Sequence, residues 1–317
     1  MKKLIIAGAA LCGALAVFAA APGPGAGTPP GAGAAPARGG FLRGLVVPVC
    51  TRASLQAAVD SYLAAQKAGD VKKIAFDDKA TYRENMSAVD PAKGLWNTKL
   101  TIAFQRSFLD SKRCRTFSEV IVTEGGHPYV IGTRLYVDAG KVTRIDSLVT
   151  DQGDWLFNAE DYLKYSRAEN WSMKPEQRTS EEAMINGANA YLDFFSDKFH
   201  EAPWGQPCAR LEGGAYTNKT KDTEDASTSC KVGIPNGVLY IVNRDYIVDE
   251  VQGVINVFCR FGDSKTGMPD SHTFAYRNGK YRWVHTLSVQ LNPPAAVSAG
   301  GMNGAAPPAA RPAAPQR

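Results

Sequence analysis

Two of the four histidines, His272 and His285, flank one predicted turn in the stretch SHTFAYRNGKYRWVHT, residues 271–286. Asn278-Gly279 at its centre is the strongest short signal for a two-residue hairpin turn, because both central residues need a positive φ. Counting outward from that turn, His272 faces His285. Since side chains alternate across a strand, the two imidazoles are expected side by side on the more aromatic, inward face.

This arrangement predicts acid–base chemistry. Two imidazoles on a dry surface disfavour each other's charged form, so one stays neutral and can accept a proton near neutral pH. We expect His285 to act as the base and His272 as its partner. Asp270, at the mouth of the same strand, and Glu212, from the preceding segment, are expected to reach the same cavity. The alternative is structural, with the imidazoles bonding each other or a buried hydroxyl and filling space.

The same residues make only the start of a metal site. A protein metal centre uses three or more ligands, and the spacing fixes no further ligand beside the two histidines and Asp270. The chain also has no phosphate-binding glycine motif after a strand and no nucleophile elbow. The sequence therefore predicts neither a metal site nor another cofactor.

The elements that must position these residues occur twice along the chain. Residues 54–68 and 179–199 each carry a helical stripe of apolar side chains. Each is followed by an irregular segment with an arginine close to a glutamate, and then by long alternating strands. AGKVTRIDSLV at 139–149 aligns with NGKYRWVHTLS at 278–288 through a shared Gly-Lys. This layout predicts an α+β fold of two tandem domains, each a helix packed on a curved antiparallel sheet.

The alignment places Asp146 where the later histidine stands in the second copy. Depending on the register of the first hairpin, Asp146 faces Gly132 or Thr133, with Arg134 close by. A desolvated Asp146 next to Tyr82 would be a proton acceptor. An ion pair between Asp146 and Arg134 is the structural alternative.

The order of helix, irregular middle and long strands resembles the nuclear transport factor 2-like superfamily, which includes the SnoaL-like polyketide cyclases. The strings RASLQAAVDSYLAAQ, YVIGTRLYV, GDWLFNA, PWGQPCARLEGG and PDSHTF…VHT are similar to a two-copy domain family of secreted fungal and bacterial proteins, over nearly all of 48–291. The superfamily resemblance implies a cone-shaped apolar pocket in each half, which in catalytic members holds an Asp, His, Glu or Tyr. The closer resemblance implies no established activity.

The ends of the chain predict export. MKKLIIAGAALCGALAVFAAAPG has two lysines, an apolar run and an alanine-rich exit, as in a cleaved signal peptide of a secreted or periplasmic protein. No other segment is long and apolar enough to cross a membrane. Ala, Gly and Pro dominate both predicted tails, whereas the Trp- and Tyr-rich segment between the copies predicts an ordered strap. The expected division is signal peptide 1–21, tail 22–44, first SnoaL-like domain 45–152, strap 153–178, second SnoaL-like domain 179–291 and tail 292–317.

Charge narrows the class of partner. The chain has 36 Lys and Arg against 31 Asp and Glu, but five of the basic residues lie within 1–40 and 293–317. The folded part is therefore neutral and lacks the basic footprint of a nucleic-acid-binding protein. The expected partner is a small apolar molecule. We expect its cofactor-free isomerisation, cyclisation or hydration, with non-catalytic binding or a structural role as the alternatives.

Five cysteines remain beyond the predicted signal peptide. Export permits disulfides, and an odd count leaves one thiol unpaired or intermolecular. We expect one bridge in each half, Cys50–Cys114 and Cys208–Cys230. Cys259, in the apolar strand VINVFCRF, is expected to be the buried free thiol.

Overall fold

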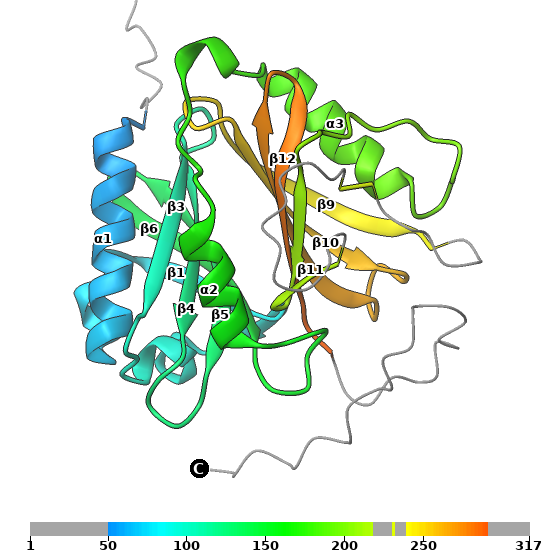
Figure 1. The fold of residues 1–317 in the computed structure, drawn as a ribbon. Helices are drawn as coiled ribbons and strands as arrows, with labels where there is room; N and C mark the ends of the chain where they lie inside the picture. Colours follow the sequence, from blue (N-terminus) through cyan, green and yellow to red (C-terminus); the bar gives the residue numbers. More distant parts are fainter. Residues whose placement is uncertain (1–49, 218–229, 232–238, 291–317) are drawn as a thin grey trace, which may run out of the picture. The chain divides into compact units, whose positions relative to one another are not determined.

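The computed structural model describes residues 50–217, 230–231 and 239–290 (Figure 1). The predicted signal peptide and both predicted tails lie outside these residues, and the domain boundaries given above remain predictions. Within the described part of the chain, no helix has both the length and the apolar character needed to span a bilayer.

The first half consists of helix α1 (Arg52–Ala68) and a six-stranded sheet of order β2-β1-β6-β5-β4-β3. The strands are β1 (Phe76–Glu84), β2 (Ser87–Val89), β3 (Phe104–Asp110), β4 (Arg115–Val122), β5 (Tyr129–Asp138) and β6 (Lys141–Thr150). Three short 3-10 helices connect them, namely η1 (Val71–Lys73), η2 (Pro91–Lys93) and η3 (Leu95–Asn97).

The second half repeats this plan, with helix α3 (Glu181–Asp193) and a sheet of order β8-β7-β12-β11-β10-β9. Its strands are β7 (Ala209–Glu212), β8 (Ala215–Tyr216), β9 (Ile241–Asp249), β10 (Val254–Phe261), β11 (Met268–Arg277) and β12 (Lys280–Ser288). Between the halves lie α2 (Ala159–Ala168) and η4 (Pro175–Gln177). The predicted α+β fold of two tandem domains is confirmed. The sequence predicted antiparallel sheets. Each sheet is instead mixed, because β1 runs parallel to β6 and β7 runs parallel to β12.

Helix α1 forms where local chemistry favours it. The Thr51 side chain caps its first turn by accepting a hydrogen bond from the Ser54 N–H, and Gly69 ends it in the left-handed conformation. The predicted stripe, which includes Leu55, Val59 and Tyr62, is buried against the first sheet. In Figure 1, α1 lies along one face of the first sheet and α3 along one face of the second.

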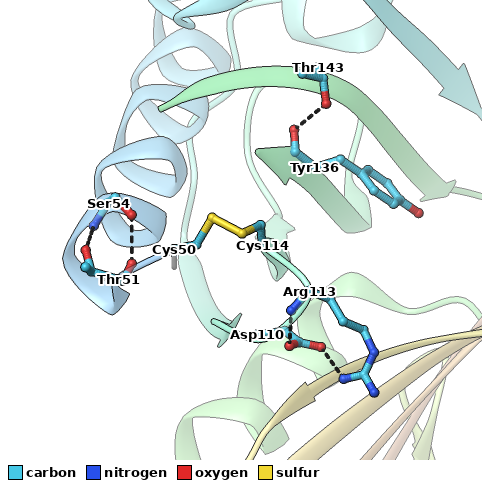
Figure 2. The surroundings of a disulfide bond; sticks show 8 residues. All are labelled: Cys50, Thr51, Ser54, Asp110, Arg113, Cys114, Tyr136 and Thr143. Carbon is cyan, nitrogen blue, oxygen red and sulfur yellow. Dashed lines mark hydrogen bonds and ion pairs between the residues drawn. A yellow bond between two sulfur atoms is a disulfide. The ribbon is translucent and has the colours of Figure 1, made fainter. Parts of the chain in front are cut away.

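Both predicted disulfides are present, and each closes within one half. Cys50, just before α1, is bonded to Cys114 in the turn between β3 and β4 (Figure 2). Cys208, just before β7, is bonded to Cys230. Cys259 is buried and unbonded, as predicted. The first bridge therefore ties the start of α1 to the sheet that it covers.

The predicted turn forms, and a bulge follows it. Asn278 and Gly279 have positive φ of 53° and 73°. Tyr276 faces Tyr281 as predicted, but the register then shifts by one residue because Arg282 is an extra residue on β12. In such a β-bulge, two residues of one strand stand opposite one residue of its partner.

The bulge separates the two histidines. Beyond it, His272 faces Thr286 and His285 faces Thr273. Because side chains alternate across a strand, His272 points toward α3 while His285 points to the opposite side of the sheet. The prediction that the two imidazoles lie side by side is wrong.

The first hairpin has the same bulge, with Thr143 as the extra residue on β6. Asp146 therefore faces Arg134, and the expectation that it faces Gly132 or Thr133 is wrong. The two copies share this irregularity at aligned positions, counted from Lys141 and Lys280. It belongs to the repeated unit and not to one hairpin alone.

The inner sides of the two sheets, which face away from α1 and α3, pack against each other, and α2 also packs against them. Phe108, Phe117 and Leu148 of the first half share one buried cluster with Phe258 and Trp283 of the second.

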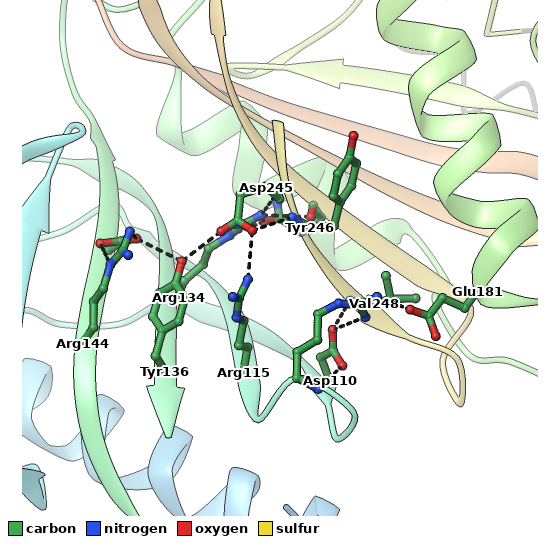
Figure 3. Close-up of polar contacts among 12 residues, drawn as sticks. Asp110, Arg115, Arg134, Tyr136, Arg144, Glu181, Asp245, Tyr246 and Val248 are labelled. Carbon is green, nitrogen blue, oxygen red and sulfur yellow. Dashed lines mark hydrogen bonds and ion pairs between the residues drawn. The ribbon is translucent and has the colours of Figure 1, made fainter. Parts of the chain in front are cut away.

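Two carboxylates fix this contact reciprocally. Asp249, at the end of β9, accepts a hydrogen bond from the Leu109 N–H at 2.8 Å. Asp110, at the end of β3, accepts one from the Val248 N–H at 2.9 Å (Figure 3). Such exchange between aligned residues is the signature of an isologous interface, here formed within one chain.

Candidate functional site

A polar group lies on the helix-facing side of the second sheet. Asp270 and His272 come from β11, Thr286 and Ser288 from β12, and Cys259 from β10. All five residues are buried. The strand pairing places them together, because Cys259 faces Asp270, Asp270 faces Ser288, and His272 faces Thr286.

Asp270 is the centre of this group. Its Oδ1 lies 2.5 Å from the His272 Nδ1, and its Oδ2 accepts a hydrogen bond from the Ser288 hydroxyl at 2.5 Å. The Cys259 thiol lies 3.8 Å from Oδ1. The carboxylate is thus held by its neighbours while it faces the imidazole.

Two buried polar atoms of the group have no hydrogen bond of acceptable geometry to any described residue. They are the His272 Nδ1, despite its short distance to Asp270, and the Thr286 Oγ1. Most buried polar side-chain atoms in proteins do have such a partner, and exceptions are frequent at functional sites. Atoms of the first half share this property, among them the Thr116 Oγ1 and the Glu119 Oε1. The pair therefore marks a candidate place for chemistry only together with the titratable groups around it.

The wall around His272 is aromatic. The ring centroids of Tyr191, Phe274 and Phe261 lie 5.3, 5.8 and 5.9 Å from that of the imidazole. Burial raises the pKa of Tyr191 well above its ordinary value, so the residue stays a neutral phenol. The imidazole is thus packed among aromatic rings.

Arg210 and Glu212 of β7 complete the polar wall on this side of the sheet. Arg210 is hydrogen-bonded to the Tyr191 hydroxyl, and its Nε donates to the Glu212 Oε1 at 2.6 Å. Burial alone would raise the pKa of Glu212, but the Arg210 guanidinium and the hydrogen bond from Trp155 lower it overall. Glu212, predicted as a site residue, is therefore an ionised partner of Arg210 and not a free base.

The first half lacks this chemistry at the aligned positions. The residues aligned with Cys259, Asp270, His272 and Ser288 are Val120, Ile131, Thr133 and Val149. The hydroxyls on the same side of the sheet are mutually satisfied, since the Thr133 Oγ1 lies 2.8 Å from the Tyr62 hydroxyl and 2.9 Å from the Ser147 Oγ. Only the second copy carries titratable groups in these places.

Cys259, Asp270 and His272 also form the one group of side chains in the described residues that can hold a metal ion, with donor atoms within 4.8 Å of one another. The set differs from the start that the sequence offered, because His285 is elsewhere and Cys259 takes part. Burial first, and then the Asp270 carboxylate, raise the pKa of the Cys259 thiol well above its ordinary value. A metal would have to displace that proton before the sulfur could bind it.

His285, the predicted base, lies in a different and entirely buried cluster on the inner side of the sheet, which faces away from α3. Its Nδ1 is 3.0 Å from the Glu119 Oε2 and its Nε2 is 2.6 Å from the Glu169 Oε2. The Tyr162 hydroxyl donates to Glu119 at 2.9 Å, and Arg106 lies 3.5 Å from the same carboxylate. Glu119 belongs to β4, Tyr162 to α2 and Glu169 to the segment after α2. The imidazole thus ties the strap to both halves.

Charge compensation governs this cluster. Burial alone would lower the pKa of His285, but the Glu169 and Glu119 carboxylates raise it to about 9. Burial alone would raise the pKa of each carboxyl, and His285 with Arg106 lowers both overall. His285 is therefore a cation between two anions, which suits a structural role and not that of a base.

The free energy of unfolding is expected to fall as pH rises toward 9. A histidine whose folded pKa is raised contributes its full stabilisation below the unfolded value of 6.5 and loses it as pH rises through about 9. The loss is about 3 kcal/mol across this window. Urea unfolding at a series of pH values, with the disulfides intact, measures it. The His127→Gln variant should show the same fall, because His127 is exposed, and the His285→Gln variant should not.

The other predicted site residues of the first half are apart from each other. Asp146 lies on the inner side of the sheet, which faces away from α1. There it is bound by Arg144 and accepts a hydrogen bond from the Tyr136 hydroxyl at 3.1 Å. Tyr82 lies in the core under α1, where its hydroxyl donates to Glu84 and its ring packs on Trp96. The prediction that Asp146 accepts a proton next to Tyr82 is wrong, because the bulge turns Asp146 away from the helix.

Comparison with known proteins gives one family match. The family described as a domain of unknown function (DUF8021) matches residues 177–288. These residues include α3, the second sheet and the polar group around His272. No curated protein matches the chain.

Three solved structures are similar to parts of the chain. An NTF-2 like protein of unknown function from Burkholderia xenovorans LB400 is 16% identical, with a TM-score of 0.26, over 31% of this chain and 84% of that one. AclR, a candidate hydroxylase from Streptomyces galilaeus, is 14% identical, with a TM-score of 0.25, over 32% and 82%. A candidate isomerase from Rhodopseudomonas palustris is 12% identical, with a TM-score of 0.25, over 31% and 90%.

Proposed function

We propose that this chain is an exported protein whose second half binds a small, largely apolar molecule beside His272 and transfers a proton on it. The observation that supports the proposal is the buried Asp270–His272 pair, in which the carboxylate lies 2.5 Å from the imidazole Nδ1. Opposite His272, the Thr286 hydroxyl has no hydrogen bond to the described residues, and a polar group of a ligand can satisfy it.

Each residue has a role in this chemistry. His272 accepts the proton, and Asp270 orients the imidazole and stabilises its charged form. Ser288 is a positioning residue, because its hydroxyl donates to Asp270. The reaction class is isomerisation, cyclisation or hydration, since these need a proton transfer and no electron transfer.

Export is the second part of the proposal. The disulfides Cys50–Cys114 and Cys208–Cys230 support it, because such bonds persist in oxidising compartments. The predicted signal peptide is the sequence feature that goes with it.

Hydrogen exchange in D2O tests the proton transfer. The purified protein is incubated with a metabolite extract, and the molecule that it retains is identified by mass spectrometry. Wild-type protein should then exchange a hydrogen of that molecule for deuterium. His272→Gln and Asp270→Asn should slow this exchange at least about 100-fold, the usual contribution of a general base. Thr133→Val, at the aligned position of the first half, is the matched control and should leave the rate unchanged.

The outcomes separate the candidate functions. Retention of a molecule without exchange by the wild-type protein would make the chain a binding protein. Exchange that survives in both His272→Gln and Asp270→Asn, with the variants folded, would contradict the assignment of the base. A chain that retains no molecule would leave only the structural role.

A further inference from the structure

A cavity of about 400 Å³ lies between the inner sides of the two sheets. Its volume is within the range of small-molecule sites. Met86 and Leu148 of the first half and Phe258 of the second give it an apolar wall. The polar lining comprises Arg83, Arg144, Asp146, Ser147, Asn243, Asp245, Arg260, Ser264 and Lys265.

The two carboxylates in this lining are already engaged with other cations (Figure 3). Asp146 is bound by Arg144. Asp245 lies 2.9 Å from the Arg115 Nη1 and 3.1 Å from the Arg134 Nη1. The Tyr136 hydroxyl joins the two carboxylates, at 3.1 and 3.0 Å. Their negative charge is thus compensated by Arg144 of the lining and by Arg115 and Arg134 outside it.

Three cations of the lining have no carboxylate partner among the described residues. Arg260 is 8% exposed, and its printed contact is a hydrogen bond to the Gly267 carbonyl at 2.6 Å. Arg83 donates to the Met86 carbonyl at 3.0 Å, and Lys265 is exposed. A nearly buried arginine is normally paired with an anion. Burial first, and then the charge of Arg83, lower the pKa of Arg260.

Because the two halves repeat, the interface has a place equivalent to the cavity at its other end. Side chains of the protein itself fill that place. There Glu119 and His285 stand at the positions aligned with Phe258 and Asp146. Glu169 from the strap supplies the further anion that this end needs. In the cavity, Arg260 forms no ion pair with a described carboxylate, although the Asp263 carboxylate raises its pKa in part.

We propose that this cavity is a binding site for a small organic anion, with Arg83, Arg260 and Lys265 at its charged group and Met86, Leu148 and Phe258 against its apolar body. A carboxylate and a phosphate monoester share the required chemistry. The site is separate from the polar group around His272, which lies on the opposite side of the second sheet.

Calorimetric titration with hexanoate, hexyl phosphate, hexanol and inorganic phosphate tests the site. Hexanoate or hexyl phosphate should bind, and the stronger of the two identifies the preferred anion. Hexanol and inorganic phosphate should bind at least tenfold more weakly, because each lacks one half of the recognised chemistry. Raising the salt concentration should weaken binding, since Arg83 and Lys265 are exposed.

Two arginine variants decide the assignment. Arg260→Gln and Arg83→Gln should each weaken binding at least tenfold, and Arg178→Gln, at an exposed arginine outside the cavity, should not. Arg83→Gln keeps the test valid if the buried Arg260→Gln change impairs folding. Equal binding of hexanol and hexanoate, or binding that the Arg83→Gln variant retains in full, would overturn the proposal.

Discussion

Replacing His285 with glutamine is expected to lower the free energy of unfolding by about 3 to 5 kcal/mol, the usual cost of removing one partner from a buried ion pair. The change leaves Glu119 and Glu169 buried without the cation that lies between them at 3.0 and 2.6 Å. Arg106, at 3.5 and 3.8 Å, compensates them only in part. Urea unfolding at pH 6 measures the difference, because the imidazole of the wild-type protein is then fully charged.

His127→Gln is the matched control for this change, since that histidine is half exposed and 3.7 Å from Asp151. It should alter the free energy of unfolding by less than about 0.5 kcal/mol, as surface substitutions usually do. A His285→Gln variant as stable as His127→Gln would show that the cluster contributes nothing to folding. Such a result would also free His285 for the catalytic role that the sequence first suggested.

Replacing Asp249 with alanine is expected to cost about 3 to 5 kcal/mol, because several hydrogen bonds to one charged group are lost together. The buried carboxylate accepts from the backbone N–H groups of Leu109, Val251 and Gln252. It also pairs with Arg52 at 2.7 Å. The variant thus loses both the turn after β9 and one of the two reciprocal contacts between the sheets. Urea unfolding measures the cost.

Asp263→Ala is the matched control for Asp249, because Asp263 also accepts from two backbone N–H groups but is exposed. It should cost less than about 1 kcal/mol. Asp110→Ala, at the aligned position, should resemble Asp249→Ala, and the double variant should cost less than the sum, since both residues hold the same contact. Strict additivity, or a harmless Asp249→Ala change, would contradict the reciprocal interface.

The sequence predicted what depends on local chemistry. The stripe through Leu55, Val59 and Tyr62 identified the buried face of α1, because helical spacing alone decides that face. Asn278-Gly279 predicted its turn for a similar reason, since few residues tolerate two successive positive φ values. The spacing of the cysteines among two similar halves was enough to predict both bridges.

The bulge was missed, although the sequence contains a signal for it. Tyr281 and Val284 both face α3, yet they are three residues apart and not two or four, and Val142 and Ile145 repeat that spacing in the first half. Regular alternation cannot place both members of such a pair on one face. Two aligned breaks in alternation therefore mark an inserted residue, and this shift moved His285 and Asp146 to the other side of their sheets.

The partners of His285 could not be read from the sequence in the same way. Glu119 and Glu169 are distant from it along the chain, and their meeting depends on how the two sheets and the strap pack. The neutral balance of charge in the folded part conceals such pairs. That only the second half carries titratable groups at these positions becomes clear once the strands are aligned. Asp270 and His272 then stand where the first half has Ile131 and Thr133.

The most direct test of the account is a crystal structure of the protein after incubation with a metabolite extract. The predicted result is ligand density in the second half, in contact with His272 and Thr286 on the side that faces α3, and its absence there from Asp270→Asn crystals treated alike. Two results would contradict the account. One is a second half that its own side chains fill up to His272, and the other is density found only on the inner side of the sheet, which faces away from α3.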